Sequence, residues 1–172
     1  MGIYVNQPSP PFGKSMAADM LTAYYSKGCD SGSLFSGLAI EKEDSFPLHR
    51  NRHNVIRWDV QRFLDGKRSI DTFIDEIERM VIRDLQREFP ECGSFPEGSR
   101  LKTVLDDIYG KSGEGFIFII DEWDCVFRMA KEQKEIQKEY LDFLRGLFKG
   151  AEYVELAYMT GILPIKKYGE HS

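Results

Sequence analysis

The chain has few of the residues that would build a disulfide framework or a zinc site. Its three cysteines, Cys29, Cys92 and Cys125, are widely spaced and form no CxxC pair. Its three histidines do not complete a zinc-ligand pattern with them. A few scattered cysteines, odd in number, are typical of an intracellular protein that keeps them reduced. We therefore expect a cytoplasmic protein without structural zinc.

The sequence also lacks a long apolar run and an excess of positive charge. No apolar stretch approaches the roughly 18 residues of a membrane span, and residues 1–6 do not begin a signal peptide. The formal net charge of −5 argues against a broad basic surface for nucleic acid. The basic cluster at residues 49–53 (HRNRH) could touch phosphate, but we interpret it as a solvated loop. Neither a membrane nor nucleic acid is an expected partner of this chain alone.

The rest of the composition is that of an ordinary folded domain. Apolar residues make up 42% of the chain and charged residues 30%, as is usual for soluble globular proteins. A length of 172 residues suits one domain with room for a core. We expect that domain to span residues 1–172.

Strand-like apolar runs alternate with helix-like spacings along the chain. Strands are predicted at residues 3–5, 55–60, 116–120 and 154–159. Helices, in which apolar side chains recur every three or four positions, are predicted at residues 14–26, 70–85, 101–110 and 131–148. Residues 28–54 read as a connection with little regular structure. This alternation predicts an α/β fold of three layers, α/β/α, with a mainly parallel sheet.

The most informative stretch is residues 116–122, with the sequence FIFIIDE. Five apolar residues in a row suit a strand that is covered on both faces, as in a parallel sheet. Asp121 and Glu122 then stand where that strand should end, and ligands of open α/β sheets lie beyond the carboxyl ends of the strands. Taken alone, the two acids could also be a solvated strand end.

Far upstream, residues 12–15 (FGKS) form the second half of a phosphate-binding loop and open a predicted helix. Free N–H groups at a helix start attract anions, so Lys14 could reach the outer phosphates of a nucleotide while Ser15 binds Mg²⁺. A bare GKS is frequent by chance, and the acid-tipped strand strengthens the interpretation. Asp121 would then help to hold Mg²⁺, and Glu122 would orient or deprotonate the attacking water.

Four further residues near these segments have two readings each. Thr160, at the tip of the last predicted strand, could hydrogen-bond the γ-phosphate or be an ordinary polar residue. Asp124 is a further acid, although a helix cap explains it more simply. Trp123 could stack on a base but is more often a packing residue. Asp59 either borders the site or faces solvent.

The loop before FGKS departs from the full GxxxxGK[ST] pattern. Pro8 stands where that pattern has its first glycine, and Pro10 and Pro11 lie inside the loop. Proline has no N–H, so three backbone donors for phosphate are missing. Each missing charge-assisted hydrogen bond could cost about 1.5–3 kcal/mol of binding. Because about 1.4 kcal/mol is a tenfold change, two of them could move a micromolar site toward millimolar.

The order of these segments resembles the predicted AAA-ATPase-like family of bacteria. The similarity covers nearly the whole chain and rests on FGKS, LFSGL at residues 34–38, IIDEWD at residues 119–124 and MTGI at residues 159–162. The resemblance implies ATP and Mg²⁺ as cofactors. It maps Lys14 and Ser15 to Walker A, Asp121 and Glu122 to Walker B, and Thr160 to the sensor position. It thus implies catalytic roles for Glu122 and Thr160, Mg²⁺ ligation by Ser15 and Asp121, and nucleotide binding by Phe12, Gly13, Lys14, Ser15 and Met16.

Two departures from the family limit the activity that the resemblance implies. Members usually have arginines just before FGKS, where this chain has Pro10 and Pro11, and they often carry a C-terminal PD-(D/E)xK-type nuclease-like domain. Neither that domain, a lid nor an arginine finger is recognisable up to Ser172, as expected of a truncated or degenerate member. We expect an ATP-binding domain with weak or lost hydrolysis. The alternative is a non-catalytic module of the same fold that forms a homo-oligomer or binds a partner protein.

Overall fold

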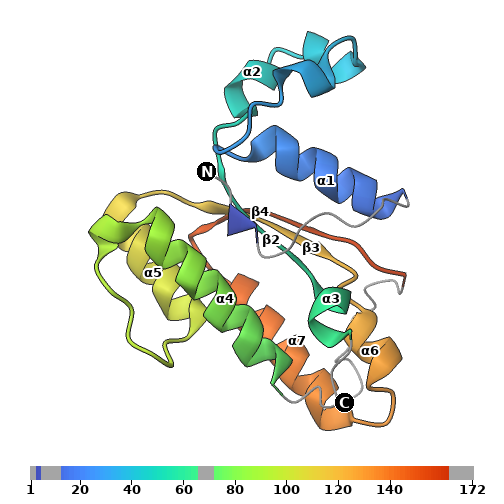
Figure 1. Cartoon of the computed structure of the whole chain (residues 1–172), viewed down its shortest axis with the longest axis vertical. Coiled ribbons are helices and arrows are strands. Elements are labelled where there is room, and N and C mark those ends of the chain that lie inside the picture. The colour runs from blue at the N-terminus through green and yellow to red at the C-terminus, as the bar shows by residue number, and fades with distance from the viewer. Residues whose placement is uncertain (1–2, 5–12, 66–71, 163–172) are drawn as a thin grey trace.

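The computed structural model describes residues 3–4, 13–65 and 72–162 of the chain. The strands form one sheet in the order β1-β2-β3-β4, and every neighbouring pair is parallel (Figure 1). Their bounds are Ile3–Tyr4 for β1, Asn54–Asp59 for β2, Phe116–Asp121 for β3 and Val154–Met159 for β4. The predicted α/β fold with a parallel sheet is therefore confirmed.

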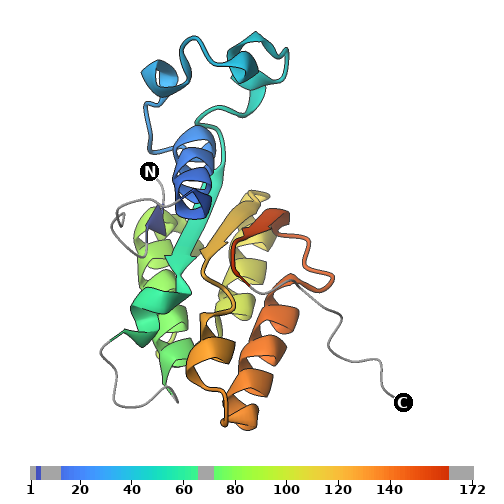
Figure 2. The same cartoon turned by 90° about the vertical axis from the view of Figure 1, so that its right-hand side faces the viewer.

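Helices cover both faces of this sheet. Figures 1 and 2 show α1 on one face and α4, α5 and α7 on the other, which is the three-layer arrangement. The long helices are α1 (Lys14–Tyr25), α4 (Phe73–Glu88), α5 (Leu101–Ser112) and α7 (Lys134–Phe148). The short ones are α2 (Phe46–His49), α3 (Val60–Leu64) and α6 (Cys125–Met129), with 3₁₀ turns at Gly32–Phe35, Ala39–Lys42 and Pro90–Cys92. No helix in the described ranges combines the length and the apolar character needed to cross a membrane.

Strand β3 lies inside the sheet, and every one of its residues is buried. Phe116, Phe118 and Ile120 point into the main core, which they share with α4, α5 and α7. Ile117 and Ile119 point the other way and pack under α1. Successive side chains of a strand alternate between its two faces. A strand with helices on both sides therefore needs apolar residues throughout, which explains the unbroken FIFII run.

The predicted amphipathic stripe of α4 is confirmed. Phe73, Ile77, Val81 and Leu85 are buried at spacings of four, and they belong to the main core. The charged residues between them face mostly outward, as a solvated helix face requires. Residue 70, with which the predicted helix begins, lies outside the described residues.

Local structure departs from the expected pattern, or adds to it, at three places. Residues 28–54 contain short helical turns, because Tyr24 of α1 stacks on Phe46 and donates a 3.0 Å hydrogen bond to its carbonyl oxygen. Helices α3 and α6 were not predicted, since five residues are too few to show a period. Met16 and Met20 share the helical spacing of α1, yet they are 47% and 44% exposed.

The register of the sheet brings the strand ends to one edge. Asp59, the last residue of β2, lies directly opposite Asp121, the last residue of β3. Ile120 is paired with Met159, so β4 ends at the same edge and delivers Thr160 there. All three strands point the same way, and their carboxyl ends gather beside the start of α1 (Figure 1).

Candidate functional site

At the carboxyl edge, the end of β3 is tied to the end of β4. Asp121 is 1% exposed and accepts two hydrogen bonds through its Oδ1 atom. One comes from the hydroxyl of Thr160 and the other, 3.0 Å long, from the backbone N–H of Glu122. Two residues predicted from the FIFIIDE stretch, Asp121 and Glu122, thus lie beside Thr160, which was predicted from the tip of the last strand.

Lys14 reaches the same edge from the start of α1. Its ammonium group donates a 2.9 Å hydrogen bond to the carbonyl oxygen of Gly161, the residue after Thr160. The amine of Lys14 and the carboxylate of Asp121 therefore lie at one end of the molecule, joined through the Thr160–Gly161 segment. A nucleotide site needs this arrangement, because phosphate and Mg²⁺ bind side by side.

The other predicted residues of the loop lie around the start of α1. Gly13 is its N-cap residue, with a φ of +23°, and Ser15 is half-buried in its first turn. No acidic residue stands in that turn to compete with an anion for the helix N-terminus. Met16 points toward solvent. Phe12 and the three prolines lie outside the described residues.

Gly161 is required by close packing. A Cβ atom at this position would lie 2.6 Å from Asp124 Oδ1 and 2.7 Å from the ring of Trp123. Trp123 is buried, packs edge-on against Phe127, and donates its backbone N–H to the Thr160 carbonyl oxygen at 2.9 Å. Trp123 is therefore a packing residue that holds the tips of β3 and β4 together.

Asp124 and Arg128 extend the site toward α6. Asp124 occupies the N-cap position of α6, but its side chain makes no capping hydrogen bond there; its Oδ2 atom instead accepts a 3.1 Å hydrogen bond from the N–H of Ile162. Arg128, one turn along α6, forms an ion pair with Glu122 and approaches Asp124. Sequence reasoning missed Arg128, and its i+4 spacing from Asp124 was the available signal.

Asp59 borders the site, but its carboxylate serves the neighbouring helix. Its Oδ1 atom accepts a 2.9 Å hydrogen bond from the N–H of Gln61 and so caps α3, and its Oδ2 atom lies 3.4 Å from Arg62. Burial raises the pKa of Asp59, and the charge of Asp121 opposite raises it further. Ionisation of Asp59 at neutral pH therefore lowers the stability of the folded protein.

We expect Asp59→Asn to stabilise the protein at pH 7 by up to about 1 kcal/mol. The raised pKa means that the folded state favours the protonated form of Asp59. Protonated Asp59 therefore stabilises the fold at low pH, and this stabilisation is lost as the pH rises from the unfolded pKa of 3.8 through the folded pKa. Asparagine keeps the cap and removes the charge. Urea unfolding at pH 7 and pH 3.5 checks this, and the gain should vanish at the lower pH.

The matched control is Asp142→Asn on α7, where the carboxylate is 48% exposed and pairs with Arg145. This variant removes the same charge from the surface and should change stability by less than about 0.5 kcal/mol at either pH. An equal gain from both variants would mean that net charge, and not the burial of Asp59 beside Asp121, sets the effect.

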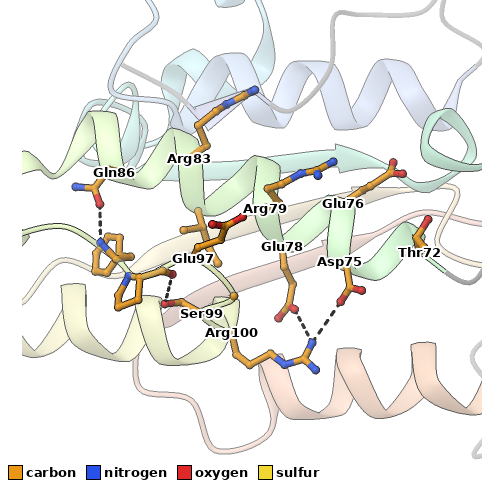
Figure 3. A pocket seen from close by; sticks show the side chains of 14 residues that line it. Thr72, Asp75, Glu76, Glu78, Arg79, Arg83, Gln86, Glu97, Ser99 and Arg100 are labelled. Atoms are coloured by element: carbon orange, nitrogen blue, oxygen red, sulfur yellow. Dashed lines mark hydrogen bonds and ion pairs between the residues drawn. The ribbon is translucent and has the colours of Figure 1, made fainter.

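Two cavities of about 810 and 710 Å³ lie elsewhere, around α4, α5, α7 and residues 95–100. Figure 3 shows the first, where Arg100 bridges Glu78 at 2.9 Å and Asp75 at 3.5 Å. Glu78 also accepts a 3.0 Å hydrogen bond from the N–H of Leu101, at the start of α5. These contacts fasten α4 to α5, so we assign the charges here a structural role.

Comparison with known protein families agrees with the motifs. The model of a family described as predicted AAA-ATPase matches residues 6–169. The chain belongs to this family, and membership indicates a nucleotide-binding NTPase domain, a class that usually uses Mg²⁺ with its nucleotide. No curated protein and no solved structure matched the chain in the same comparisons.

Proposed function

We propose that the chain binds ATP with Mg²⁺ at the carboxyl edge of its sheet and hydrolyses it slowly or not at all. The observation that supports this best is the contact between Lys14 and Gly161, beside the Thr160–Asp121 hydrogen bond. These contacts support the proposal because they link a cation from the start of α1 to the segment that carries a hydroxyl and an acid at the strand ends. Lys14 would neutralise the outer phosphates, and its ammonium group would exchange the neutral carbonyl oxygen of Gly161 for charged phosphate oxygens.

The residues of this edge fit Mg²⁺, which prefers oxygen ligands and keeps several waters. Asp121 offers a carboxylate at the strand end, and Ser15 offers a hydroxyl in the first turn of α1. These two side chains would hold the ion, directly or through water. When bound, Mg²⁺ would supply the positive charge that offsets the charge of the phosphates.

Glu122 and Thr160 would act on the γ-phosphate side. Glu122 would orient or deprotonate the attacking water, and the hydroxyl of Thr160 would hydrogen-bond the γ-phosphate or that water. Slow turnover is expected because three prolines before Gly13 remove backbone donors to phosphate. Related NTPases also gain about 10³–10⁵ in rate from an arginine finger, and no residue of this chain stands out in sequence as one.

Replacing Lys14 with alanine tests the site. We expect the affinity for ATP with Mg²⁺, measured by isothermal titration calorimetry, to fall by about 10- to 100-fold, since a charged hydrogen-bond donor to phosphate is lost. Lys138→Ala removes an exposed lysine on α7 and should leave the affinity unchanged. Turnover that persists in Lys14→Ala would refute the assignment. Lack of binding by the unmodified chain at millimolar ATP would favour the non-catalytic interaction module.

A further inference from the structure

Arg128 holds the side chain of Glu122 in an ion pair. Its Nη2 atom donates to Oε2 of Glu122, and its Nε atom lies 3.7 Å from Oδ2 of Asp124. The two paired side chains, those of Arg128 and Glu122, are only 34% and 20% exposed. A charge-assisted pair that is partly shielded from water is stronger than a pair on an open surface. The position of the Glu122 carboxylate therefore depends on Arg128.

The backbone at Glu122 is fixed independently of this pair. Its φ of +52° lies in the left-handed region, which is uncommon for a residue with a Cβ atom. Two backbone hydrogen bonds donated by the residues just after Glu122 hold the turn, from Trp123 N–H to the Thr160 carbonyl and from Cys125 N–H to the Glu122 carbonyl, both 2.9 Å. Only the side chain of Glu122 is then free to change position, and its present partner is Arg128.

We propose that Arg128 is a positioning residue that keeps Glu122 in a resting conformation, and that binding of ATP with Mg²⁺ opens the pair. This inference rests on the function proposed above. A carboxylate oxygen occupied by a guanidinium cannot accept a proton from water at that position. Phosphate oxygens compete with carboxylates for the same donors of arginine, so an arriving nucleotide weakens the hold on Glu122.

This arrangement has a consequence for affinity that does not require hydrolysis. If the pair is closed without nucleotide and open with it, binding includes the cost of opening. Removing the pair in advance then removes that cost, and the nucleotide binds more tightly. The charge changes themselves also alter affinity, but they act separately for each residue and cancel in a double-mutant cycle.

The test measures the affinity for a nonhydrolysable ATP analogue with Mg²⁺ in four proteins: the unmodified chain, Arg128→Gln, Glu122→Gln and the double variant. We expect the double variant to bind about tenfold less tightly than the product of the two single effects predicts, since the opening cost can be removed only once. A second cycle on the exposed Arg145–Asp142 pair of α7, with N···O 2.6 Å, should show no coupling.

Three results would overturn the inference, and they can be told apart. Additive effects of the two substitutions, with all four proteins binding, show that the pair stays as it is. Weaker binding by Arg128→Gln that Arg128→Lys restores, without coupling to Glu122, shows that Arg128 serves as a phosphate contact alone and does not hold Glu122 in a resting conformation. Binding by none of the four removes the proposed function, and this inference with it. Arg128→Lys, which keeps the charge but loses the fork of donors, replaces Arg128→Gln in the cycle if the glutamine variant does not fold.

Discussion

Replacing Phe118 with alanine is expected to lower the free energy of unfolding by about 3–5 kcal/mol, enough to remove much of the stability of a typical domain. Phe118 is fully buried in the middle of β3. Its ring meets Phe148 edge-on at 5.2 Å and Trp58 at 6.3 Å between centroids. The variant would leave a cavity between the sheet and the helices. Denaturant unfolding followed by circular dichroism measures the resulting loss of stability.

Leu156→Ala on β4 is the control for this effect. Leu156 is also a large apolar strand residue, but it is 40% exposed, so its loss should cost less than about 1 kcal/mol. If the alanine variant of Phe118 does not fold, Phe118→Leu keeps most of the apolar volume and gives a measurable, smaller loss. Similar costs at Phe118 and Leu156 would contradict the assignment of β3 as the centre of the core.

Replacing Asp121 with asparagine is expected to weaken binding of ATP in the presence of Mg²⁺ by about 10- to 100-fold, and to have little effect without Mg²⁺. Asparagine can still accept the hydrogen bonds from Thr160 and from the Glu122 N–H, so the turn is retained while the charged oxygen ligand is lost. Titration calorimetry with Mg²⁺ and with a chelator present separates the two conditions.

Asp59→Asn is the matched control, because it removes the same charge from the residue directly opposite in the sheet. The carboxylate of Asp59 already caps α3 and pairs with Arg62. Its replacement should therefore leave the Mg²⁺ dependence of ATP binding unchanged. An equal loss in both variants would mean that the general negative charge of this edge attracts Mg²⁺, and that Asp121 is no specific ligand.

Strands and long helices were predictable because each carries its own periodic pattern. The strand predicted at residues 154–159 is found over the same residues, and residues 116–120 form all but the last residue of β3. Short elements were not predictable, since α3 and α6 depend on neighbours distant in the chain. The exposed Met16 and Met20 show the same limit. The spacing of apolar residues in α1 did not indicate which side of the helix packs against the sheet.

The candidate site was predictable in its residue types but not in its contacts. Separate motifs indicated Lys14, Asp121 and Thr160, and the structure brings all three to one edge. Arg128 escaped prediction because it belongs to none of the motifs, and only the turn between β3 and α6 brings its side chain back to Glu122. The family model independently assigns the chain to the predicted AAA-ATPase family, whereas the roles of these residues remain predictions to be tested.

The amino-acid sequence by itself determined the alternation of strands and helices, the buried character of β3 and the residues that end it, because hydrophobic periodicity is local. Tertiary structure alone decided that Asp59 faces Asp121 and that Lys14 reaches Gly161. Strand register and helix docking set these contacts. Both depend on how side chains pack across the whole sheet, and no short stretch of sequence records that.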